Sequence, residues 1–250
     1  MKLTVISHFY NEEYLLPWWL KFHREIFDDG ILIDHGSTDR SREIIAEICP
    51  DWRVVDTKLT WFDPVANDLE VNQYEREAPG WKIALNITEF FCGDARSAIR
   101  KTENRGLRLY GVSLIDQERD HQIEPAPHMP IHKQRHWGIV NGGTIGSRRR
   151  LLHCYPFGTY HPGRHAWVNE FEDTEELTVV HLFCSPMTDR FIARKVQIKD
   201  KIANPQVNNG NGWQHYLGPG QIMEMWKNQI PNAVFLPDQR FWRESTRCFC

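Results

Sequence analysis

Two short apolar runs near the N-terminus, each followed at once by polar residues, constrain the fold of this chain most strongly. The first run covers residues 3–6 and the second covers residues 31–33. The segment between them is rich in aromatic residues and has the length of a helix, so the unit predicts strand, helix and strand. Open α/β sheets are built from such units and bind ligands beyond the carboxyl ends of their strands. We therefore expect a ligand site at the polar residues that follow the two runs.

The composition is that of a chain able to bury a core of its own. Of its 250 residues, 41% are hydrophobic and 25% are charged, and the net charge is −3. Because Lys and Arg are spread along the sequence, no basic face for nucleic acid is expected. No apolar run approaches the roughly 20 residues of a membrane span, and the N-terminus lacks the apolar stretch of a signal peptide. These features predict a cytoplasmic protein without a membrane span, whose six scattered cysteines are reduced thiols.

Strand and helix patterns alternate through the first third of the chain. Apolar spacing and breaker residues predict helices over residues 12–27, 41–48 and 64–77 and strands over residues 53–56 and 81–85. Asn11 is expected to cap the first helix. The alternation predicts an α/β fold with a mostly parallel central sheet flanked by helices.

Beyond residue 85 the pattern is less regular. It predicts strands over residues 107–115, 138–145 and 177–183, helices over residues 188–201 and 221–228, and a long loop over residues 118–136. We expect one domain of Rossmann-like architecture over residues 1–203. Residues 204–250 then form an irregular extension that packs on the same domain.

The polar residues after the two apolar runs are candidates for binding a nucleotide. Short polar side chains and free backbone N–H groups at strand ends suit a ribose or a base. The candidates are His8, Tyr10, Asn11, Glu12, Asp34, Ser37 and Asp39. Ordinary helix capping is the alternative for residues 37–39. A glycine-rich dinucleotide motif and a P-loop lysine are both missing from the sequence, which removes the main support for those two nucleotide-binding classes.

An ordered series of motifs runs through the first 200 residues. It begins with Asn11-Glu12-Glu13, Trp19-Leu20 with His23, and Asp34-x-x-Ser37-x-Asp39. The fourth strand is followed by Asn86-Ile87-Thr88-Glu89-Phe90. The later motifs are Asn141-Gly142-Gly143 with Arg148-Arg149, then Gly163-Arg164-His165, Val179-Val180-His181, Phe191 and Lys195. In this order they resemble the GT-A glycosyltransferases of the family 2 type.

The resemblance implies a GT-A fold and the transfer of a sugar. The donor would be a nucleoside diphosphate sugar of the UDP or TDP type, the acceptor a hydroxyl of a glycan, and the reaction would proceed with inversion. Asp68 and Asn86 join the candidates for donor binding. An aromatic ring such as that of Trp137 suits stacking on a sugar. The candidates on the acceptor side are Gly142, Gly143, Trp137 and His181.

Two other functions remain open alongside this one. The first is a nucleotide-sugar or glycan-binding protein without turnover, in which the metal motif has decayed. The second is a sugar-1-phosphate nucleotidyltransferase, which shares the nucleotide-binding sheet. Such enzymes usually open with a loop rich in glycine and arginine, and this sequence has none.

The motif at residues 86–90 departs from the family in a way that bears on metal binding. The subgroup that the chain most resembles has Asp-x-Asp-Glu-Phe there, and its paired aspartates hold a divalent cation that bridges the donor diphosphate. Asn86 and Thr88 replace both aspartates here. A weakly held Mn²⁺ or Mg²⁺ at Glu89 and Thr88, with help from Asp68 or His165, is the favoured interpretation. Metal-independent transfer, with cationic side chains holding the diphosphate, is the alternative.

Inverting transfer also needs a base that takes the proton of the acceptor hydroxyl. In the family this base is an Asp or Glu beyond the glycine turn, which points to Asp173 or Glu172. His165 competes for the role. Residues 170–176 are acidic enough to form an ordinary solvated loop, and that is the alternative for the two carboxylates.

Overall fold

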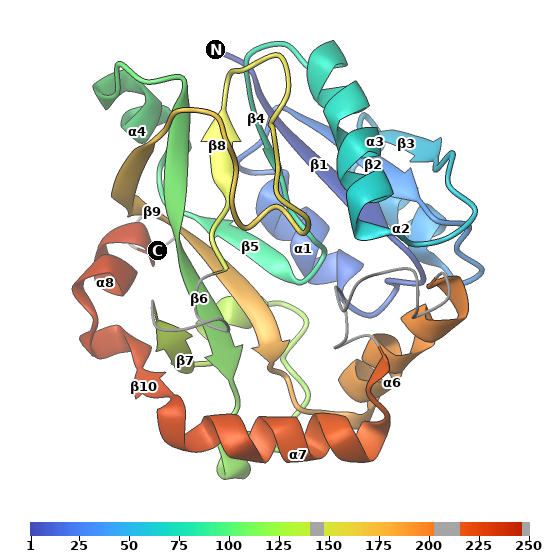
Figure 1. Ribbon diagram of the computed structural model, residues 1–250. Coiled ribbons are helices and arrows are strands. Elements are labelled where there is room, and N and C mark those ends of the chain that lie inside the picture. Colours follow the sequence, from blue (N-terminus) through green and yellow to red (C-terminus); the bar gives the residue numbers. More distant parts are fainter. Residues whose placement is uncertain (141–147, 203–215, 247–250) are drawn as a thin grey trace.

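The N-terminal part of the chain forms a four-stranded parallel sheet (Figure 1). The computed structural model describes residues 1–140, 148–202 and 216–246. The four strands are β1 (Leu3–Phe9), β2 (Asp29–Asp34), β3 (Arg53–Asp56) and β4 (Trp81–Ala84). Strand β1 pairs with β2 and β4, and β2 also pairs with β3, all in parallel. The predicted series of parallel strands is therefore confirmed, and both apolar runs lie inside this sheet.

Three helices cover the two faces of this parallel sheet. They are α1 (Leu16–His23), α2 (Ser41–Ile48) and α3 (Pro64–Glu77). In Figure 1, α3 lies on the near face, while α1 and α2 lie behind the sheet. Successive side chains of a strand point to opposite faces, so Val5 packs in the core cluster that includes α1 and α2, and Ile6 in the one that includes α3.

The chain beyond β4 extends the sheet with mostly antiparallel pairings. Its strands are β5 (Glu89–Cys92), β6 (Gly106–Ile115), β7 (Trp137–Val140), β8 (Leu151–His153), β9 (Glu172–Cys184) and β10 (Val234–Phe235). Its helices are α4 (Ala95–Lys101), α6 (Asp189–Gln197), α7 (Pro219–Gln229) and α8 (Arg240–Thr246). The main path of the sheet runs β10-β7-β6-β8-β4-β1-β2-β3, and β9 joins β5 to β6 beside it. The predicted α/β fold, a central sheet flanked by helices, is confirmed.

Several predicted boundaries need correction. The first helix begins at Leu16 and not at residue 12, because Asn11 has a φ of 50° and the chain turns before the helix starts. Asn11 therefore does not cap this helix. The acidic residues 172–176 form the beginning of β9 and not a loop, because they pair with β6. Strands β5, β8 and β10 and helices α4 and α8 were not predicted.

The carboxyl ends of β1, β4, β6 and β9 lie at one edge of the sheet. Strand β8 is antiparallel to both β4 and β6, so β6 runs in the direction of β4, and β9 is parallel to β6. Helix α7 runs across this edge at the bottom of Figure 1. Among the described residues, no helix combines the length and the apolar character needed to cross a membrane. The polar strand ends predicted to bind a ligand all lie at this carboxyl edge.

Candidate functional site

The loop that follows β4 is held in place by the indole of Trp19. This side chain of α1 is fully buried, and its Nε1 donates to the carbonyl oxygen of Glu89 at 2.9 Å and lies 3.2 Å from that of Asn86. The N–H of Asn86 donates in turn to Oε2 of Glu89 at 2.9 Å. The loop is therefore a tight, buried turn at the carboxyl edge of the sheet.

Glu89 and Arg150 form a buried, two-point ion pair within this loop. Arg150 donates from Nε to Oε2 at 2.7 Å and from Nη2 to Oε1 at 2.6 Å. Its remaining Nη1 donates to the carbonyl oxygens of Gly163 and Arg164. Only 1% of the Arg150 side chain is exposed, and Glu89 is completely buried. The planar fork of the guanidinium thus occupies both carboxylate oxygens.

The three residues predicted to hold a divalent cation do not fit one in this arrangement. Both oxygens of Glu89 already accept hydrogen bonds from Arg150. His165 Nδ1 lies 3.0 Å from Nη1 of the same guanidinium, and the carbonyl oxygen of Thr88 accepts the N–H of Leu182. A cation placed among these groups would face a positive charge without a free carboxylate to offset it. The guanidinium of Arg150 lies at the position where the metal was expected.

A second guanidinium lies on the other side of the same loop. Arg164 donates from Nη1 to Oδ1 of Asp68 at 2.6 Å, and from Nη2 to Oδ1 of Asn86 at 3.1 Å. The N–H of Gly163 donates to the other carboxylate oxygen of Asp68 at 3.0 Å. Asp68 and Asn86, both predicted to bind the donor, therefore position an arginine at the carboxyl edge.

Two further cations lie close to this pair of arginines. Arg148 stacks its guanidinium 5.5 Å from the ring centroid of Phe183, and Lys195 donates to the carbonyl oxygen of Phe183. Burial lowers the pKa of Arg148. Burial, together with the positive charges of Arg194 and Arg148, lowers the pKa of Lys195 to about 8. We call Arg148, Arg150, Arg164 and Lys195 the basic cluster.

Two histidines of the cluster region are held neutral. Burial, followed by the charges of Arg150 and Arg148, lowers the pKa of His165 to about 2. Burial and the charges of Arg148 and Lys195 hold the pKa of His181 well below its usual range. Because both rings are neutral, the positive charge of this region comes from the four cations of the basic cluster.

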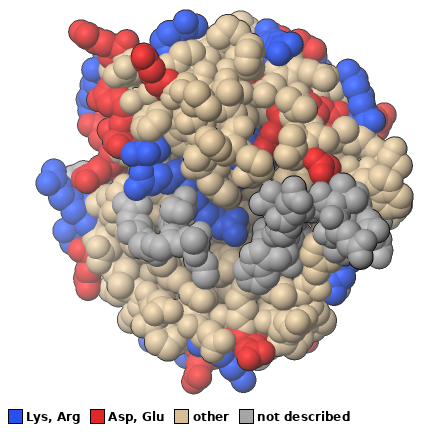
Figure 2. Space-filling view, in the orientation of Figure 1, with Lys and Arg blue, Asp and Glu red and all other residues tan. Residues whose placement is uncertain are grey.

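The basic cluster carries more positive than negative charge. Arg150 pairs with Glu89, and Arg164 pairs with Asp68. In the part of the chain that the structure describes, no carboxylate lies within ion-pair distance of Arg148 or Lys195. Figure 2 shows Lys and Arg side chains gathered near the centre of one face of the molecule. Because unpaired buried charge is costly, this arrangement favours an anionic ligand.

The loops after β1 and β2 are tied together by three of the predicted nucleotide-binding residues. Asn11 Oδ1 accepts the N–H of Thr38 at 2.7 Å, and the N–H of Asn11 donates to Oγ of Ser37 at 3.0 Å. Ser37 in turn donates its hydroxyl and its N–H to Oδ1 of Asp34. The loops after β1 and β2 are therefore joined by hydrogen bonds into one unit at the carboxyl edge of the sheet.

Three predicted donor-binding carboxylates are already engaged by protein groups. Asp34 Oδ2 accepts a hydrogen bond from Nε of Arg42 at 2.5 Å, while its Oδ1 accepts the two bonds from Ser37. Both oxygens of Glu12 accept hydrogen bonds from Arg194 in α6, and burial raises the pKa of Glu12. Asp39 accepts the backbone N–H groups of residues 13 and 41. The N-cap position of α2 is Arg40, so Asp39 is not the helix cap, although it accepts the N–H of the first helical residue.

His8 and Tyr10, the two remaining donor-site predictions, lie at and just after the end of β1. Nε2 of His8 lies 3.0 Å from Oε2 of Glu70, on the face of the sheet covered by α3. Burial lowers the pKa of His8. The ring of Tyr10 packs against Nζ of Lys201, 4.9 Å from its centroid. Only 6% of the His8 side chain is exposed, and Tyr10 is half-buried.

The structure separates the two carboxylates predicted as the catalytic base from the rest of the site. Asp173 is opposite Arg108 in the pairing of β9 with β6, and His181 is opposite Ser113. This places Asp173 about 17 Å from the level of His181, measured along β6. Asp173 pairs with Arg108, and Glu172 accepts the hydroxyl of Thr102 at 2.6 Å. We therefore withdraw both as candidate bases, since they lie toward the amino end of β6.

The acceptor-side predictions divide into three groups. Trp137 opens β7, and its ring packs against Phe235 with the centroids 5.4 Å apart. His181 lies in the pairing of β9 with β5, directly opposite Glu89. Gly142 and Gly143 lie outside the described residues. Of the two that the structure describes, His181 contributes to the environment of the basic cluster.

Arg150 was not predicted, and the cationic role of Arg148, Arg164 and Lys195 was not assigned. The run of arginines at residues 148–150 is the one sequence signal that could have found Arg150. In an extended chain, alternate residues point the same way. Arg150 therefore turns inward to Glu89, while Arg149 reaches Asp173 at 3.8 Å.

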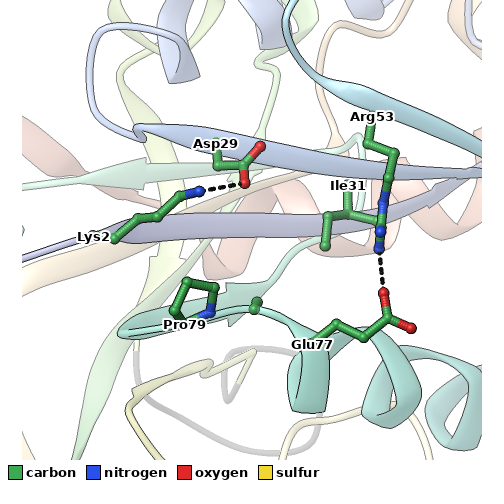
Figure 3. A pocket seen from close by; sticks show the side chains of 7 residues that line it. Lys2, Asp29, Ile31, Arg53, Glu77 and Pro79 are labelled. Atoms are coloured by element: carbon green, nitrogen blue, oxygen red, sulfur yellow. Dashed lines mark hydrogen bonds and ion pairs between the residues drawn. The ribbon is translucent and has the colours of Figure 1, made fainter.

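A shallow pocket lies away from these residues. Figure 3 shows it at the amino ends of the parallel strands, bordered by the ion pairs of Lys2 with Asp29 and of Arg53 with Glu77. Ligands of α/β sheets bind at the opposite edge. We therefore place the candidate site at the carboxyl edge.

Comparison with known proteins finds similarity only among solved structures. No family model matches the chain, and no curated protein matches it. The chain is similar to fragment 1–349 of TarS from S. aureus, with a TM-score of 0.45 and 15% identity, over 80% of this chain and 65% of that one. A longer TarS structure has a TM-score of 0.42 and 14% identity, over 92% of this chain and 43% of that one.

A second similar protein comes from another organism. It is glucosyl-3-phosphoglycerate synthase from Mycobacterium tuberculosis, in complex with Mn²⁺, UDP and glucosyl-3-phosphoglycerate. The TM-score is 0.38 with 11% identity, over 61% of this chain and 56% of that one. The chain therefore spans less than two thirds of the length of each of these three structures.

Proposed function

We propose that this protein is a glycosyltransferase that moves a sugar from a nucleoside diphosphate sugar, of the UDP or TDP type, to a hydroxyl of a glycan. The observation that carries the proposal is the excess of buried positive charge in the basic cluster. A diphosphate supplies matching negative charge and enough oxygens to accept hydrogen bonds from several cations. The ordered motifs of the sequence and the position at the carboxyl edge support the same conclusion.

Arg148 and Lys195 would bind the diphosphate in this scheme. They are the two cluster members that have no carboxylate partner among the described residues. Negative charge builds on the leaving diphosphate as the bond to the sugar breaks, and positioned cations stabilise it. Arg150 and Arg164 shape the loop of residues 86–89 beside it. Cationic side chains thus supply the charge that a divalent metal supplies in the family that the sequence resembles.

Inversion would proceed by direct attack of the acceptor hydroxyl on the anomeric carbon. His165 is our candidate for the base, since it is neutral and borders the basic cluster. A pKa of about 2 makes it a weak base in the empty site. A bound diphosphate would raise that pKa, because nearby negative charge favours the imidazolium form. The histidine would accept the hydroxyl proton only while the donor is in place.

The test combines donor binding with a matched pair of variants. We expect a UDP- or TDP-sugar to raise the Tm of the protein, and nucleoside diphosphate release to be measurable when a glycan acceptor is supplied. Arg148→Ala should weaken donor binding about 10-fold or more, since a charged hydrogen bond is worth about 1.5–3 kcal/mol. Arg149→Ala is the control, because the side chain of Arg149 pairs with Asp173. A protein that binds no nucleotide sugar would refute the proposal.

A donor-binding protein without turnover is the second candidate. The observation in its favour is that both carboxylates predicted as the base lie away from the basic cluster. One measurement separates a glycosyltransferase from a donor-binding protein. Donor binding without release of nucleoside diphosphate, across a panel of glycan acceptors, would identify the binding protein.

A further inference from the structure

Three polar side chains from separate elements meet beneath the carboxyl ends of β1 and β2. His8 comes from β1, His35 follows β2, and Glu70 lies in α3. The N–H of His35 donates to the carbonyl oxygen of Phe9 at 2.9 Å, which fixes the backbone of the second histidine beside the first strand. Since side chains alternate along a strand, His8 points to the α3 face and meets Glu70 there.

The geometry of the three side chains is that of a ligand set. Each offers one ligand atom, and these atoms all lie within 4.8 Å of one another. The two imidazole centroids are 5.0 Å apart with an interplanar angle of 47°, so the rings converge without stacking. The three are also nearly enclosed, with 6% of His8 and 3% of Glu70 exposed at the side chain and 6% of His35 exposed overall.

Each histidine of this trio has a buried nitrogen without a hydrogen-bond partner. These atoms are Nδ1 of His8 and Nε2 of His35. Buried polar atoms are nearly always satisfied, so an unpartnered nitrogen on each of two neighbouring imidazole rings calls for an explanation. A metal ion is a partner that both imidazole rings and the carboxylate can share.

The carboxylate of the trio is already oriented by hydrogen bonds from its surroundings. Glu70 Oε1 accepts the N–H of Lys58 at 2.7 Å, and Oε2 accepts the hydroxyl of Thr57 at 2.6 Å. Such bonds fix the direction of a metal-binding carboxylate and are typical of built metal sites. Both donors lie just after β3, so the sheet itself holds Glu70 in place.

We propose that His8, His35 and Glu70 form a binding site for a divalent transition metal, of the class of Zn²⁺. Two imidazoles and one carboxylate suit zinc and its neighbours in the first transition row, whereas Mg²⁺ and Ca²⁺ prefer oxygen ligands. Three protein ligands leave a fourth coordination position for water or another ligand. The site joins the ends of β1 and β2 to α3 and is separate from the loop of residues 86–89. It does not depend on the proposed sugar transfer.

The experiment measures metal on the full chain in the absence of any nucleotide sugar. Purified protein is loaded with Zn²⁺, dialysed, and analysed by mass spectrometry of the elements, and affinity is measured against a chromophoric chelator. We expect about one equivalent of zinc per chain. Zinc at about 100 times its Kd should also raise the Tm by about 5 °C or more, while Mg²⁺ should leave it unchanged.

Variants of the trio and a matched histidine decide between this site and adventitious binding. His35→Ala and Glu70→Gln should lose zinc affinity about 100-fold and lose the zinc-dependent shift in Tm. His128→Ala, which removes an exposed histidine elsewhere, should bind zinc like the wild type. Circular dichroism checks that each variant is folded. If a variant does not fold, the visible spectrum of Co²⁺-loaded wild type, with bands of a nitrogen- and oxygen-ligated ion, provides the readout.

Two results would overturn the proposal. One is a wild-type protein that retains no zinc after loading and shows no shift in Tm. The other is retention by folded His35→Ala and Glu70→Gln proteins equal to that of the wild type. Because neither measurement involves a nucleotide sugar, a failure of the proposed function would leave this test unaffected.

Discussion

Arg150 places Nε and Nη2 on the two carboxylate oxygens of Glu89, at 2.7 and 2.6 Å, inside the loop where the resembling family binds a metal. The pair is almost completely removed from water. A fixed positive charge of the protein therefore stands in this loop. The charge that remains for a ligand comes from the other members of the basic cluster, chiefly Arg148 and Lys195.

Removing one partner of this pair should destabilise the fold strongly. Glu89→Gln leaves the Arg150 charge buried without a carboxylate, which costs about 3–5 kcal/mol in comparable buried pairs. Urea unfolding of both proteins measures the loss as a lower midpoint. The double variant Glu89→Leu with Arg150→Met removes both charges and should recover much of the loss.

The control for this prediction is an exposed carboxylate. Glu172→Gln changes a side chain that is exposed at the start of β9, and its unfolding midpoint should match that of the wild type. Equal midpoints for Glu89→Gln and the wild type would mean that the ion pair contributes little to folding.

Donor binding should weaken as the pH rises through the pKa of Lys195. Burial lowers this pKa to about 8, far below the usual range for lysine. Below pH 8 the ammonium is charged and attracts the diphosphate, and above pH 8 the free protein increasingly loses that charge. Bound diphosphate favours the charged form, so the apparent pKa is higher in the complex. We expect the donor Kd to rise about 10-fold between pH 7.5 and pH 9.5.

Calorimetric titrations at several pH values measure this effect. Lys195→Arg keeps a positive charge over the whole range, so its donor Kd should vary little with pH. The stability of the fold should change with pH in the opposite direction to donor binding. The pKa of Lys195 is lower in the folded than in the unfolded state, so the unfolded state binds more protons between the two values. The destabilising effect of burying this lysine therefore decreases as the pH rises from about 8. A donor Kd that improves with pH would contradict the assignment.

Local signals explain which parts of the fold could be predicted from the sequence. Helix α3 has the predicted bounds, because Asp63 caps it and Pro64 occupies its first turn. The three residues of β8 are too few to show a period, so that strand was missed. A solvated loop was the alternative for residues 170–176 because they are acidic, but residues 172–174 pair with β6 at the start of β9.

The candidate site was harder to predict because its contacts are distant in sequence. Arg150 is 61 residues from Glu89, and Arg164 is 96 residues from Asp68. No local pattern reports that an arginine will fold back on a particular carboxylate. The motif residues Asn86 and Glu89 were found from the resemblance, but their partners became visible only in the structure. Glu89, the one carboxylate among the expected metal ligands, is therefore not a free ligand, because Arg150 donates to both of its oxygens.

Replacing His165 should affect the chemical step more than donor binding. His165→Asn removes a proton acceptor next to the basic cluster but keeps a polar side chain, so kcat should fall about 100-fold or more with a donor Kd within about threefold of wild type. Asp173→Asn is the matched control and should keep full turnover, since Asp173 lies about 17 Å along β6 from His181. The reverse pattern, an inactive Asp173→Asn and an active His165→Asn, would restore the acidic residue as the base.

Turnover should not require Mg²⁺ or Mn²⁺. Arg150 occupies both oxygens of Glu89, so no free carboxylate of the loop is available to a hard cation. Protein treated with EDTA and then assayed across a titration of each ion should show the same rate of nucleoside diphosphate release. Arg148→Ala under the same conditions tests the alternative directly, since added Mn²⁺ should not restore its donor binding. A rate that rises about 10-fold or more with either ion would mean that the Glu89 pair opens to admit a metal during catalysis.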